Sequence, residues 1–317
     1  MLKCGMRILI MGAGAIGSVV GGMMARAGHT VTLIGRAAHI KAIADKALHI
    51  TGIWGDHHVR TLDARTSADG LNPGDFDVIF IVVKSFDTRS AMEFAAPLAD
   101  DNTLVCSYQN GLGNAEIIAE FVGWQRTVGV RAIYGVRCPE PGAAHVTVIA
   151  NPTAFGVYDD TAPNERVREL AASLDDAGLP TVYTDSIQAV LWSKVTYNCA
   201  LNPLSALLNV PYGGLTKTEH TRSLIREIVH EVYAVAEAAN VPLEPATPAA
   251  YVDHLFDVLI PPTASHFASM HEDLARGRRT EIDSLNGAIC RYGEEHGIAC
   301  PANSFLTRLI KAREVAV

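Results

Sequence analysis

The segment ILIMGAGAIG, residues 8–17, decides the fold of the first half of the chain. Its apolar residues predict a buried strand, and Gly12, Gly14 and Gly17 follow in the GxGxxG spacing. The first glycine permits a tight turn, the second lets the backbone approach a pyrophosphate, and the third allows close packing of the next helix. The segment therefore predicts a strand, a turn and a helix that together bind a dinucleotide.

The start of the predicted helix and the end of the second strand complete this site. Ala15 and Ile16 offer backbone N–H groups at the positive end of the helix dipole, where phosphate binds. The second strand, TVTLI, is followed by Gly35 and Arg36, whereas an NAD site usually has an acidic residue there. Arg36 can clamp a 2′-phosphate, which favours NADP(H); a solvated surface arginine is the alternative.

The pattern beyond this segment extends the fold. Strand-like runs at 7–11, 30–34, 77–83 and 103–108 alternate with helical segments, which is typical of βαβ units and a mostly parallel sheet. Between 127 and 158 the runs VGVRAIYGV, HVTVIA and AFGVYD have no helix between them, so we expect an antiparallel extension. A helix in 164–180 and a last strand, PTVYTD, follow.

After Asp185 the chain reads as helices, with breaks at VPYGG, VPLEPATP and LIPPTAS. A length of 317 residues exceeds the usual size of one domain. We therefore predict an α/β, Rossmann-type dinucleotide-binding domain over residues 1–185. An all-helical domain over residues 186–317 is expected to carry the substrate-binding and catalytic groups.

The charge and the cysteine content indicate what kind of molecule the protein binds and in which compartment it is found. The chain has 26 basic and 34 acidic residues, a formal net charge of −8, and no basic run, which argues against a nucleic-acid or membrane surface and favours a small molecule. The six cysteines form no CxxC pair, which indicates reduced core residues. We find neither a secretory signal nor an apolar span of about 18 residues, and we expect a soluble, cytoplasmic protein.

The helical half contains a polar stripe in WSKVTYNCALNPL, residues 192–204. Lys194, Asn198 and Asn202 are four residues apart, so they share one face of an otherwise apolar helix. A buried lysine is unfavourable without a partner or a purpose. The alternative is a lysine that extends to solvent beside two structural amides.

Two further polar residues follow predicted strands of the first half. Lys84 ends the run DVIFIVV, and Asn110 follows TLVCSY within the motif QNGLG. Ligands of open α/β sheets gather at the carboxyl ends of the strands, so both residues are candidates for the ligand site. A turn lysine and an Asn-Gly turn are the alternatives.

Candidate residues also occur near the C-terminus. Ser265, Ser269 and Asp273 are spaced to share a helix face, and the segment TEID, residues 280–283, is predicted to start another helix. Glu281 is expected either to neighbour Lys194 and keep it protonated or to belong, with Asp283, to the acidic first turn of a capped helix.

The histidines give no sign of a metal site. His230-Glu231 and His271-Glu272 begin like HExxH, but neither has the second histidine four residues on. The twelve histidines show no ligand-like cluster in the sequence, so no metal ion is expected.

Taken together and in this order, the motifs resemble the ketopantoate reductase (2-dehydropantoate 2-reductase) family over nearly the full length. The motifs are MGAGAIG, VVK, QNGLG, WSKVTYNCALNP, and SM, TEID and NG at 269–287. The resemblance implies reduction of the ketone of 2-dehydropantoate to pantoate with NADPH, a step toward pantothenate and coenzyme A.

The resemblance also implies roles for particular residues. Lys194 corresponds to the catalytic proton donor and Glu281 to the assisting glutamate. The substrate-binding residues of the family correspond to Asn198, Asn202 and Ser269. Lys84 and Asn110 match positions that line the nicotinamide and substrate cleft, and Glu281 is also expected near the cofactor.

Three positions depart from common family residues: Asp87, Tyr212 and His266. They leave the reaction type intact and put the substrate in doubt, so another 2-keto acid is an alternative. A β-hydroxyacid dehydrogenase and a non-catalytic NADP(H) sensor are two further readings. A homodimer is an expectation from the helical half.

Overall fold

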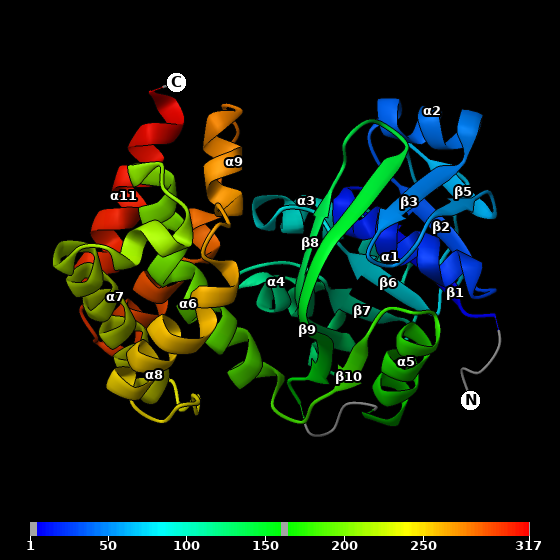
Figure 1. Ribbon diagram of the computed structural model, residues 1–317. Coiled ribbons are helices and arrows are strands. Elements are labelled where there is room, and N and C mark those ends of the chain that lie inside the picture. The colour runs from blue at the N-terminus through cyan, green and yellow to red at the C-terminus, as the bar shows by residue number, and fades with distance from the viewer. Residues whose placement is uncertain (1–4, 160–163, 317) are drawn as a thin grey trace. The chain divides into compact units, whose positions relative to one another are not determined.

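The computed structural model describes residues 5–159 and 164–316 and divides into two units (Figure 1). Unit 1 contains the chain up to Gln109 together with Asn114–Ile187, and unit 2 contains Asn110–Gly113 and the chain from Gln188 onward. The short segment Asn110–Gly113 thus belongs with the second unit, although the chain on both sides of it belongs to the first. The sequence pattern gave no indication of this.

Unit 1 is built on one sheet. Its strands are β1 (Arg7–Met11), β2 (Thr30–Ile34), β3 (Leu48–Gly52), β4 (His57–Val59), β5 (Leu62–Arg65), β6 (Val78–Ile81), β7 (Leu104–Ser107), β8 (Thr127–Arg137), β9 (Ala143–Val157) and β10 (Thr181–Tyr183). The spatial order is β4-β3-β9-β8-β7-β6-β1-β2-β5, with β10 beside β9. From β5 through β1 to β8 all neighbouring strands are parallel. The order reverses between β1 and β6, which is where ligands bind in such sheets.

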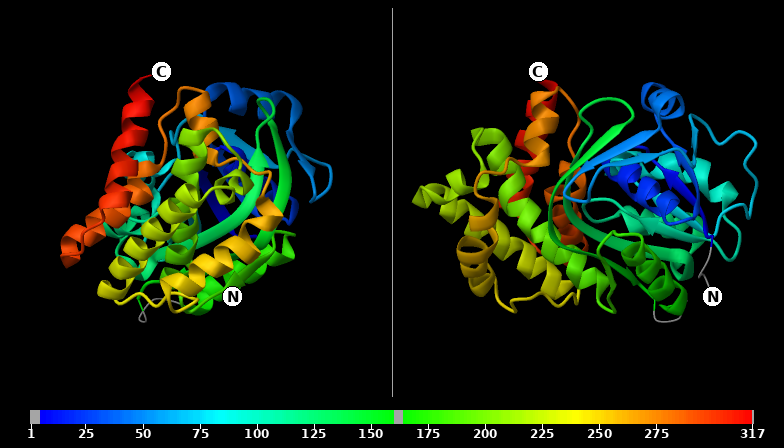
Figure 2. Two further views of the ribbon diagram at one scale, coloured as in Figure 1. Left: turned by 60° about the vertical axis from the view of Figure 1, so that its left-hand side comes forward. Right: turned by 45° about the vertical axis from the view of Figure 1, so that its right-hand side comes forward.

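The remaining strands form a mixed extension. β9 is antiparallel to β8, and the two run as one long twisted ribbon in each view (Figure 2). β3 and β10 are parallel to β9, and β4 is antiparallel to β3. The predicted antiparallel extension is confirmed, but HVTVIA and AFGVYD form the single strand β9 instead of two. β3, β4 and β5 were not predicted, because they are short and only partly buried.

Helices cover both faces of the parallel part of the sheet. They are α1 (Ala15–Arg26), α2 (Ala37–Lys46), α3 (Thr88–Ala95), α4 (Asn114–Val122) and α5 (Asn164–Asp176). Ile8 and Ile10 of β1 pack in a core with residues of α1 and α5, whereas Leu9 and Met11 pack in a second core with residues of α3 and α4. Burial on both faces explains why the four residues of β1 after Arg7 are all apolar.

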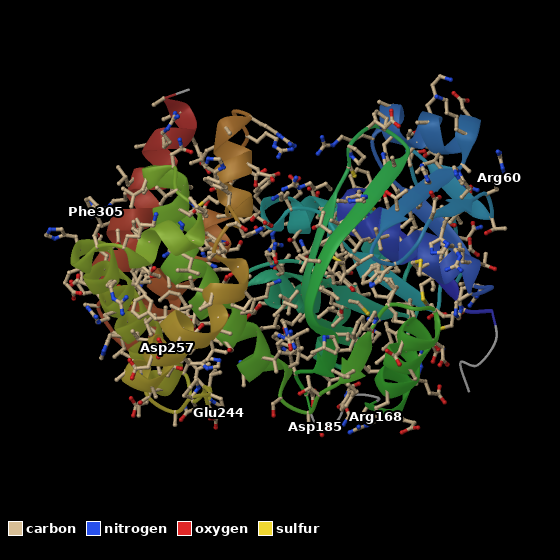
Figure 3. The ribbon with its side chains drawn as sticks, in the orientation of Figure 1. Arg60, Arg168, Asp185, Glu244, Asp257 and Phe305 are labelled. Atoms are coloured by element: carbon tan, nitrogen blue, oxygen red, sulfur yellow. The ribbon has the colours of Figure 1, made fainter. Side chains whose placement is uncertain are left out.

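One surface contact of unit 1 connects α5 to the segment after β10. Arg168 forms an ion pair with Asp185 at 2.8 Å (Figure 3). Its guanidinium also lies 3.8 Å from the centre of the Tyr183 ring. A cation over an aromatic face adds a modest stabilisation, so this contact helps to hold β10 against α5.

Unit 2 is helical, with no strand among its described residues. Its α-helices are α6 (Ile187–Leu208, beginning one residue inside unit 1), α7 (Glu219–Ala238), α8 (Pro248–His254), α9 (Ser269–Ala275), α10 (Asn286–His296) and α11 (Pro301–Val315). Trp192, Val195 and Cys199 of α6 are almost fully buried. The prediction of an α/β Rossmann-type domain followed by an all-helical domain is confirmed. Within the described chain, no helix combines the length and apolar character needed to cross a bilayer.

A buried amide network joins four helices of unit 2. Asn286 of α10 donates hydrogen bonds to the carbonyl of Cys199 at 3.2 Å and to Oδ1 of Asn303 at 2.9 Å. Asn303 donates in turn to the carboxylate of Glu231 at 2.8 Å, which also accepts the N–H of Ala302 at the start of α11. These hydrogen bonds link α6, α7, α10 and α11, while Oδ1 of Asn286 is buried with no hydrogen-bond partner among the described residues.

Candidate functional site

The glycine turn of unit 1 has the backbone geometry that the sequence predicts. Gly12 has a φ of +118°, and an added Cβ would lie 2.9 Å from the backbone of Val82. At Gly17 an added Cβ would lie 2.1 Å from the carbonyl oxygen of Gly12. Both positions require glycine for reasons within the protein itself.

Gly14 is different, because no contact within the described chain requires a glycine there. Its φ is −82°, and an added Cβ would meet nothing within 4 Å. It caps α1, whose first turn contains no acidic residue and receives no side-chain cap. The N–H groups of Ala15, Ile16 and Gly17 precede the first helical bond, from Ser18 to Gly14 at 2.9 Å. Open space beside unpaired helix N–H groups fits a pyrophosphate, so the residues present suit a dinucleotide.

Two matched substitutions test this distinction. Gly17→Ala is expected to destabilise unit 1 by about 1–3 kcal/mol, because the methyl group overlaps the Gly12 carbonyl. Gly14→Ala is expected to leave the melting temperature unchanged and to raise the Kd for NADPH about ten-fold or more. Thermal denaturation and fluorescence titration measure the two effects. Wild-type affinity in a folded Gly14→Ala protein would show that the phosphates bind elsewhere.

The end of β2 lies directly against the glycine turn. The N–H groups of Gly12 and Ala13 donate to the carbonyl of Ile34 at 3.1 and 2.8 Å. An added Cβ at Gly35 would lie 2.3 Å from the Cβ of Ala13. The next residue, Arg36, is exposed and caps α2, whose first turn contains no acidic residue. A guanidinium and a helix N-terminus at the same point suit an anion.

His39 fixes the start of α2 against α1. The N–H of Gly142 donates to its Nδ1 at 3.0 Å, so its Nε2 carries the proton and donates to Oγ of Ser18 at 2.9 Å. Burial lowers the pKa of His39, which is consistent with this neutral tautomer. The side chain therefore connects the first turn of α2 to α1, and the sequence pattern did not single it out.

Lys84 lies three residues beyond the end of β6, which is shorter than the predicted strand, and it caps the short 3₁₀ turn Ser85–Asp87. Gln109, two residues beyond the end of β7, is buried and donates to the carbonyl of Val83 at 3.1 Å and to Oγ1 of Thr88 at 2.8 Å. These bonds tie the carboxyl ends of β6 and β7 together. Gln109 was missed because nothing in the pattern separates it from its neighbour Asn110 in QNGLG.

Three predicted residues from distant parts of the chain meet within unit 2. Nζ of Lys194, on α6, donates to Oδ1 of Asn110 at 2.7 Å. Nδ2 of Asn110 lies 3.5 Å from Oε2 of Glu281, at the limit of a hydrogen bond. Lys194 is half-buried and Glu281 is buried. The Asn110 amide thus connects an amine to a carboxylate through both of its polar atoms.

The segment that carries Asn110 is held closely against the turn after Glu281. The N–H of Leu112 donates to the carbonyl of Ser284 at 2.8 Å. Gly111 has a φ of +85°, and an added Cβ would lie 2.4 Å from that same oxygen. The close approach of the two backbones requires glycine at 111 and fixes the position of the neighbouring amide.

The other two amides of the polar stripe differ in their surroundings. Asn198 is half-buried, one helical turn from Lys194. Asn202 is 4% exposed, and its Oδ1 accepts a hydrogen bond from Oη of Tyr212 at 2.8 Å. Burial raises the pKa of Tyr212 well above its usual value, so the phenol stays a donor. The oxygen of Asn202 therefore already has a partner within the protein.

Aromatic rings surround this end of the stripe. The Tyr212 ring lies edge-on to Tyr197 with centroids 5.7 Å apart, and it lies 5.4 Å from the ring of His266. Two of the three positions that depart from the family pattern, Tyr212 and His266, are therefore in contact. The third, Asp87, is exposed and precedes α3.

The expectation that Ser265, Ser269 and Asp273 share a helix face is wrong for Ser265, whereas Ser269 and Asp273 both lie on α9. Ser269 begins α9 and is exposed, but Ser265 lies in the preceding turn and shares no helix face with it. Asp273 is buried and pairs with Arg278 at 2.8 Å. The break between the two serines comes from the backbone before α9, where Tyr212 and Gly213 bond to the carbonyls of His266 and Ala264.

The segment TEID does not begin a long helix. Ile282–Ser284 is a 3₁₀ turn, and α10 starts at Asn286. Oγ1 of Thr280 accepts the N–H of Ile282 at 3.3 Å, and Asp283 pairs with Lys311 at 2.6 Å, so no capping box forms. This leaves Glu281 at the corner between Thr280 and the turn, where it meets Asn110.

Comparison with known proteins connects these features to one family. Residues 8–160 match the family model described as ketopantoate reductase PanE/ApbA, and residues 186–314 match the model of its C-terminal part. The chain is 36% identical over 310 residues to 2-dehydropantoate 2-reductase of Aquifex aeolicus, covering 98% of this chain and 97% of that protein.

Solved structures show the same relationship. The chain resembles the PanE/ApbA family ketopantoate reductase of Ralstonia eutropha with a TM-score of 0.88 and 34% identity, over 98% of this chain and 99% of the other. It also resembles D-mandelate dehydrogenase, solved with NADH and anilino(oxo)acetate, with a TM-score of 0.86 and 28% identity over the same shares.

Proposed function

Because the chain belongs to the ketopantoate reductase PanE/ApbA family of NAD(P)-dependent 2-keto acid reductases, we propose that it reduces 2-dehydropantoate to pantoate with NADPH. The observation that carries this proposal is the half-buried amine of Lys194, held at 2.7 Å by Asn110, whose amide also reaches the buried carboxylate of Glu281. A surface lysine with no chemical role needs neither partner.

The cofactor, when bound, supplies the hydride that reduces the C2 ketone. The residues of this chain supply the complementary charge and the proton. Negative charge develops on the ketone oxygen, and the ammonium of Lys194 stabilises it and transfers a proton from Nζ to that oxygen. Hydride and proton together convert C=O to CH–OH, and Lys194 is left as the neutral amine.

Asn110 and Glu281 prepare Lys194 for this step. The Asn110 oxygen accepts one of the three ammonium protons and so fixes the direction of the side chain. A carboxylate nearby favours the charged form of an amine. Asn198, Ser269 and the N–H groups of Asn202 are the donors and acceptors that we assign to the carboxylate and hydroxyl of the substrate.

For the cofactor we propose NADPH. Gly12, Gly14 and Gly17 with the N–H groups of Ala15 and Ile16 hold the pyrophosphate, and Arg36 holds the 2′-phosphate. Lys84, Asn110 and Glu281 are assigned to the nicotinamide end. The five cysteines among the described residues are all free thiols, which supports a cytoplasmic location.

A second candidate substrate is a 2-keto acid with a bulkier or aromatic side chain. Two observations favour this substrate. The rings of Tyr197, Tyr212 and His266 lie together, and the Asn202 oxygen accepts a hydrogen bond from Tyr212. A site in which that oxygen is occupied has lost an acceptor for a substrate hydroxyl.

A panel of 2-keto acids distinguishes these candidates. We expect consumption of NADPH, followed by its absorbance, with the highest kcat/KM for 2-dehydropantoate. A higher kcat/KM for an aromatic 2-keto acid such as benzoylformate would replace the first proposal with the second. Absence of turnover with every acid would favour a non-catalytic NADP(H) sensor.

A further inference from the structure

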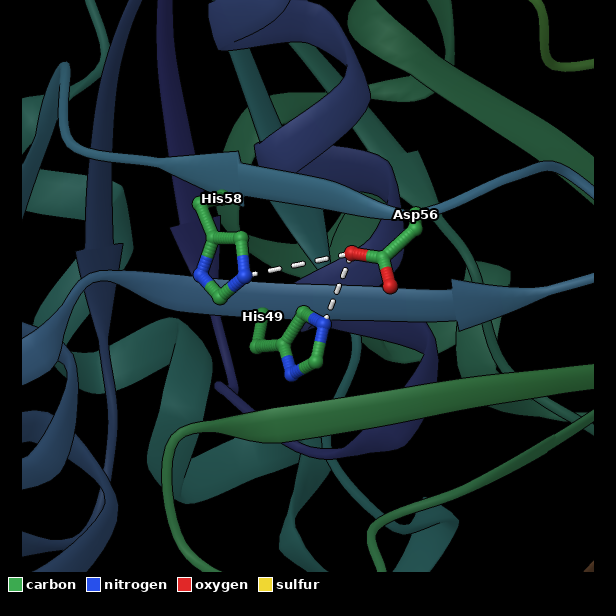
Figure 4. A group of neighbouring side chains, drawn as sticks. All are labelled: His49, Asp56 and His58. Atoms are coloured by element: carbon green, nitrogen blue, oxygen red, sulfur yellow. Dashed lines mark hydrogen bonds and ion pairs between the residues drawn. The ribbon is translucent and has the colours of Figure 1, made fainter.

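Three side chains of ligand type meet on the hairpin of β3 and β4 in unit 1, and none of them belongs to the sites described above. His49 lies on β3, His58 on β4 and Asp56 in the loop between them (Figure 4). Oδ1 of Asp56 lies 2.9 Å from Nε2 of His49 and 3.9 Å from Nε2 of His58. One ligand atom from each residue lies within 4.8 Å of the other two.

The strand register explains why these residues meet. His49 and His58 are direct partners in the antiparallel ladder. The neighbours of His49, Leu48 and Ile50, are buried, so alternation along the strand turns His49 to the opposite face. The expectation that the histidines form no ligand-like cluster is wrong, because a strand register is invisible to a search for fixed motif spacings.

The distances suit a tetrahedral metal site. Zinc ligands lie about 2.0–2.1 Å from the metal, which separates two ligand atoms by about 3.3 Å. The two distances from Asp56 lie on either side of this value. Two imidazoles and one carboxylate form a ligand set that zinc accepts, and water can take the fourth position.

The hairpin has room for the rearrangement that binding requires. The imidazole rings are stacked, with centroids 4.1 Å apart and planes 10° apart. Their nitrogen lone pairs therefore lie in nearly parallel planes, and the rings must turn before both can point at one metal ion. The exposed fractions of the His49, His58 and Asp56 side chains are 37%, 62% and 71%, so rotation about the Cβ–Cγ bonds meets little protein.

We propose that His49, Asp56 and His58 bind one divalent transition-metal ion of the zinc class on the surface of unit 1. The ion joins β3, β4 and the loop between them. This site is independent of the reductase proposal, because none of its residues takes part in cofactor or substrate binding.

Equilibrium dialysis of the purified full-length protein against Zn²⁺ tests the proposal. We expect one zinc ion per chain in the wild type and loss of that ion in His49→Ala and in His58→Ala. Asp56→Asn is expected to weaken binding about ten-fold or more, since one anionic ligand is lost. The matched control is His145→Ala: this exposed histidine of β9 lies 2.8 Å from Oγ1 of Thr51 and outside the cluster.

A second measurement separates loss of the site from loss of the fold. Without metal, the three variants and the control are expected to have the wild-type melting temperature, because the side chains are exposed. Zn²⁺ is expected to raise the melting temperature of the wild type and of His145→Ala only. Absence of zinc in the wild type, or zinc binding unchanged by both His49→Ala and His58→Ala, would overturn the proposal.

Discussion

Replacing Lys194 by alanine is expected to lower kcat by about 10²- to 10⁴-fold, the usual contribution of a positioned general acid. The remaining side chain can neither stabilise charge on the ketone oxygen nor protonate it. Binding of NADPH is expected to persist, since the glycine turn and Arg36 belong to unit 1. Steady-state turnover with 2-dehydropantoate measures the first effect, and fluorescence titration with NADPH measures the second.

The matched control is Lys217→Ala, which removes an exposed lysine of the same unit. We expect it to retain wild-type kcat. A Lys194→Ala protein with near-normal turnover would contradict the assignment of the proton donor. If Lys194→Ala loses activity because it no longer folds, its melting temperature will be lowered. In that case Lys194→Met, whose side chain is about as long as that of lysine, is tested in place of Lys194→Ala.

Replacing Arg36 by alanine is expected to weaken NADPH binding by about 10- to 100-fold, since charge-assisted hydrogen bonds contribute about 1.5–3 kcal/mol. Affinity for NADH is expected to stay unchanged, because NADH has no 2′-phosphate. The side chain of Arg36 is exposed and makes no capping hydrogen bond to α2, so the fold is expected to be unaffected. Fluorescence titration of both cofactors with the wild type and the variant measures the difference.

Arg60→Ala is the control for a general effect of charge, because Arg60 is an exposed arginine elsewhere in unit 1 (Figure 3). Its removal is expected to leave both affinities unchanged. Equal affinity of the wild type for NADPH and NADH would remove the basis for the cofactor proposal. The related D-mandelate dehydrogenase was solved with NADH.

Local features of unit 1 could be predicted from the sequence because they depend on residues close together in the chain. Gly17 is required by its contact with the Gly12 carbonyl, and the positive φ of Gly12 belongs to the same turn that the GxGxxG pattern specifies. The strands β3, β4 and β5 escaped prediction because their stability comes from neighbours in the sheet. They contain three to five residues each, and their sequences carry histidine, arginine and aspartate in place of a continuous apolar run.

The candidate site of unit 2 was predicted in part. Four-residue spacing placed Lys194, Asn198 and Asn202 on one helix face, but the meeting of Asn110 with Glu281 spans 171 positions of the chain. No periodicity reveals a contact over that range, and only the resemblance to a family brought these residues together. The bond from Tyr212 to Asn202 was not anticipated, because the burial of a tyrosine hydroxyl depends on how the helices pack.

The most direct test of the account is a crystal structure of the protein with NADP⁺ and pantoate. We predict that Nζ of Lys194 lies within about 2.7–3.2 Å of the C2 hydroxyl oxygen, with Asn110 still bonded to the amine. A hydroxyl bound at that distance by another side chain, with the Lys194 amine directed to solvent, would contradict the central claim.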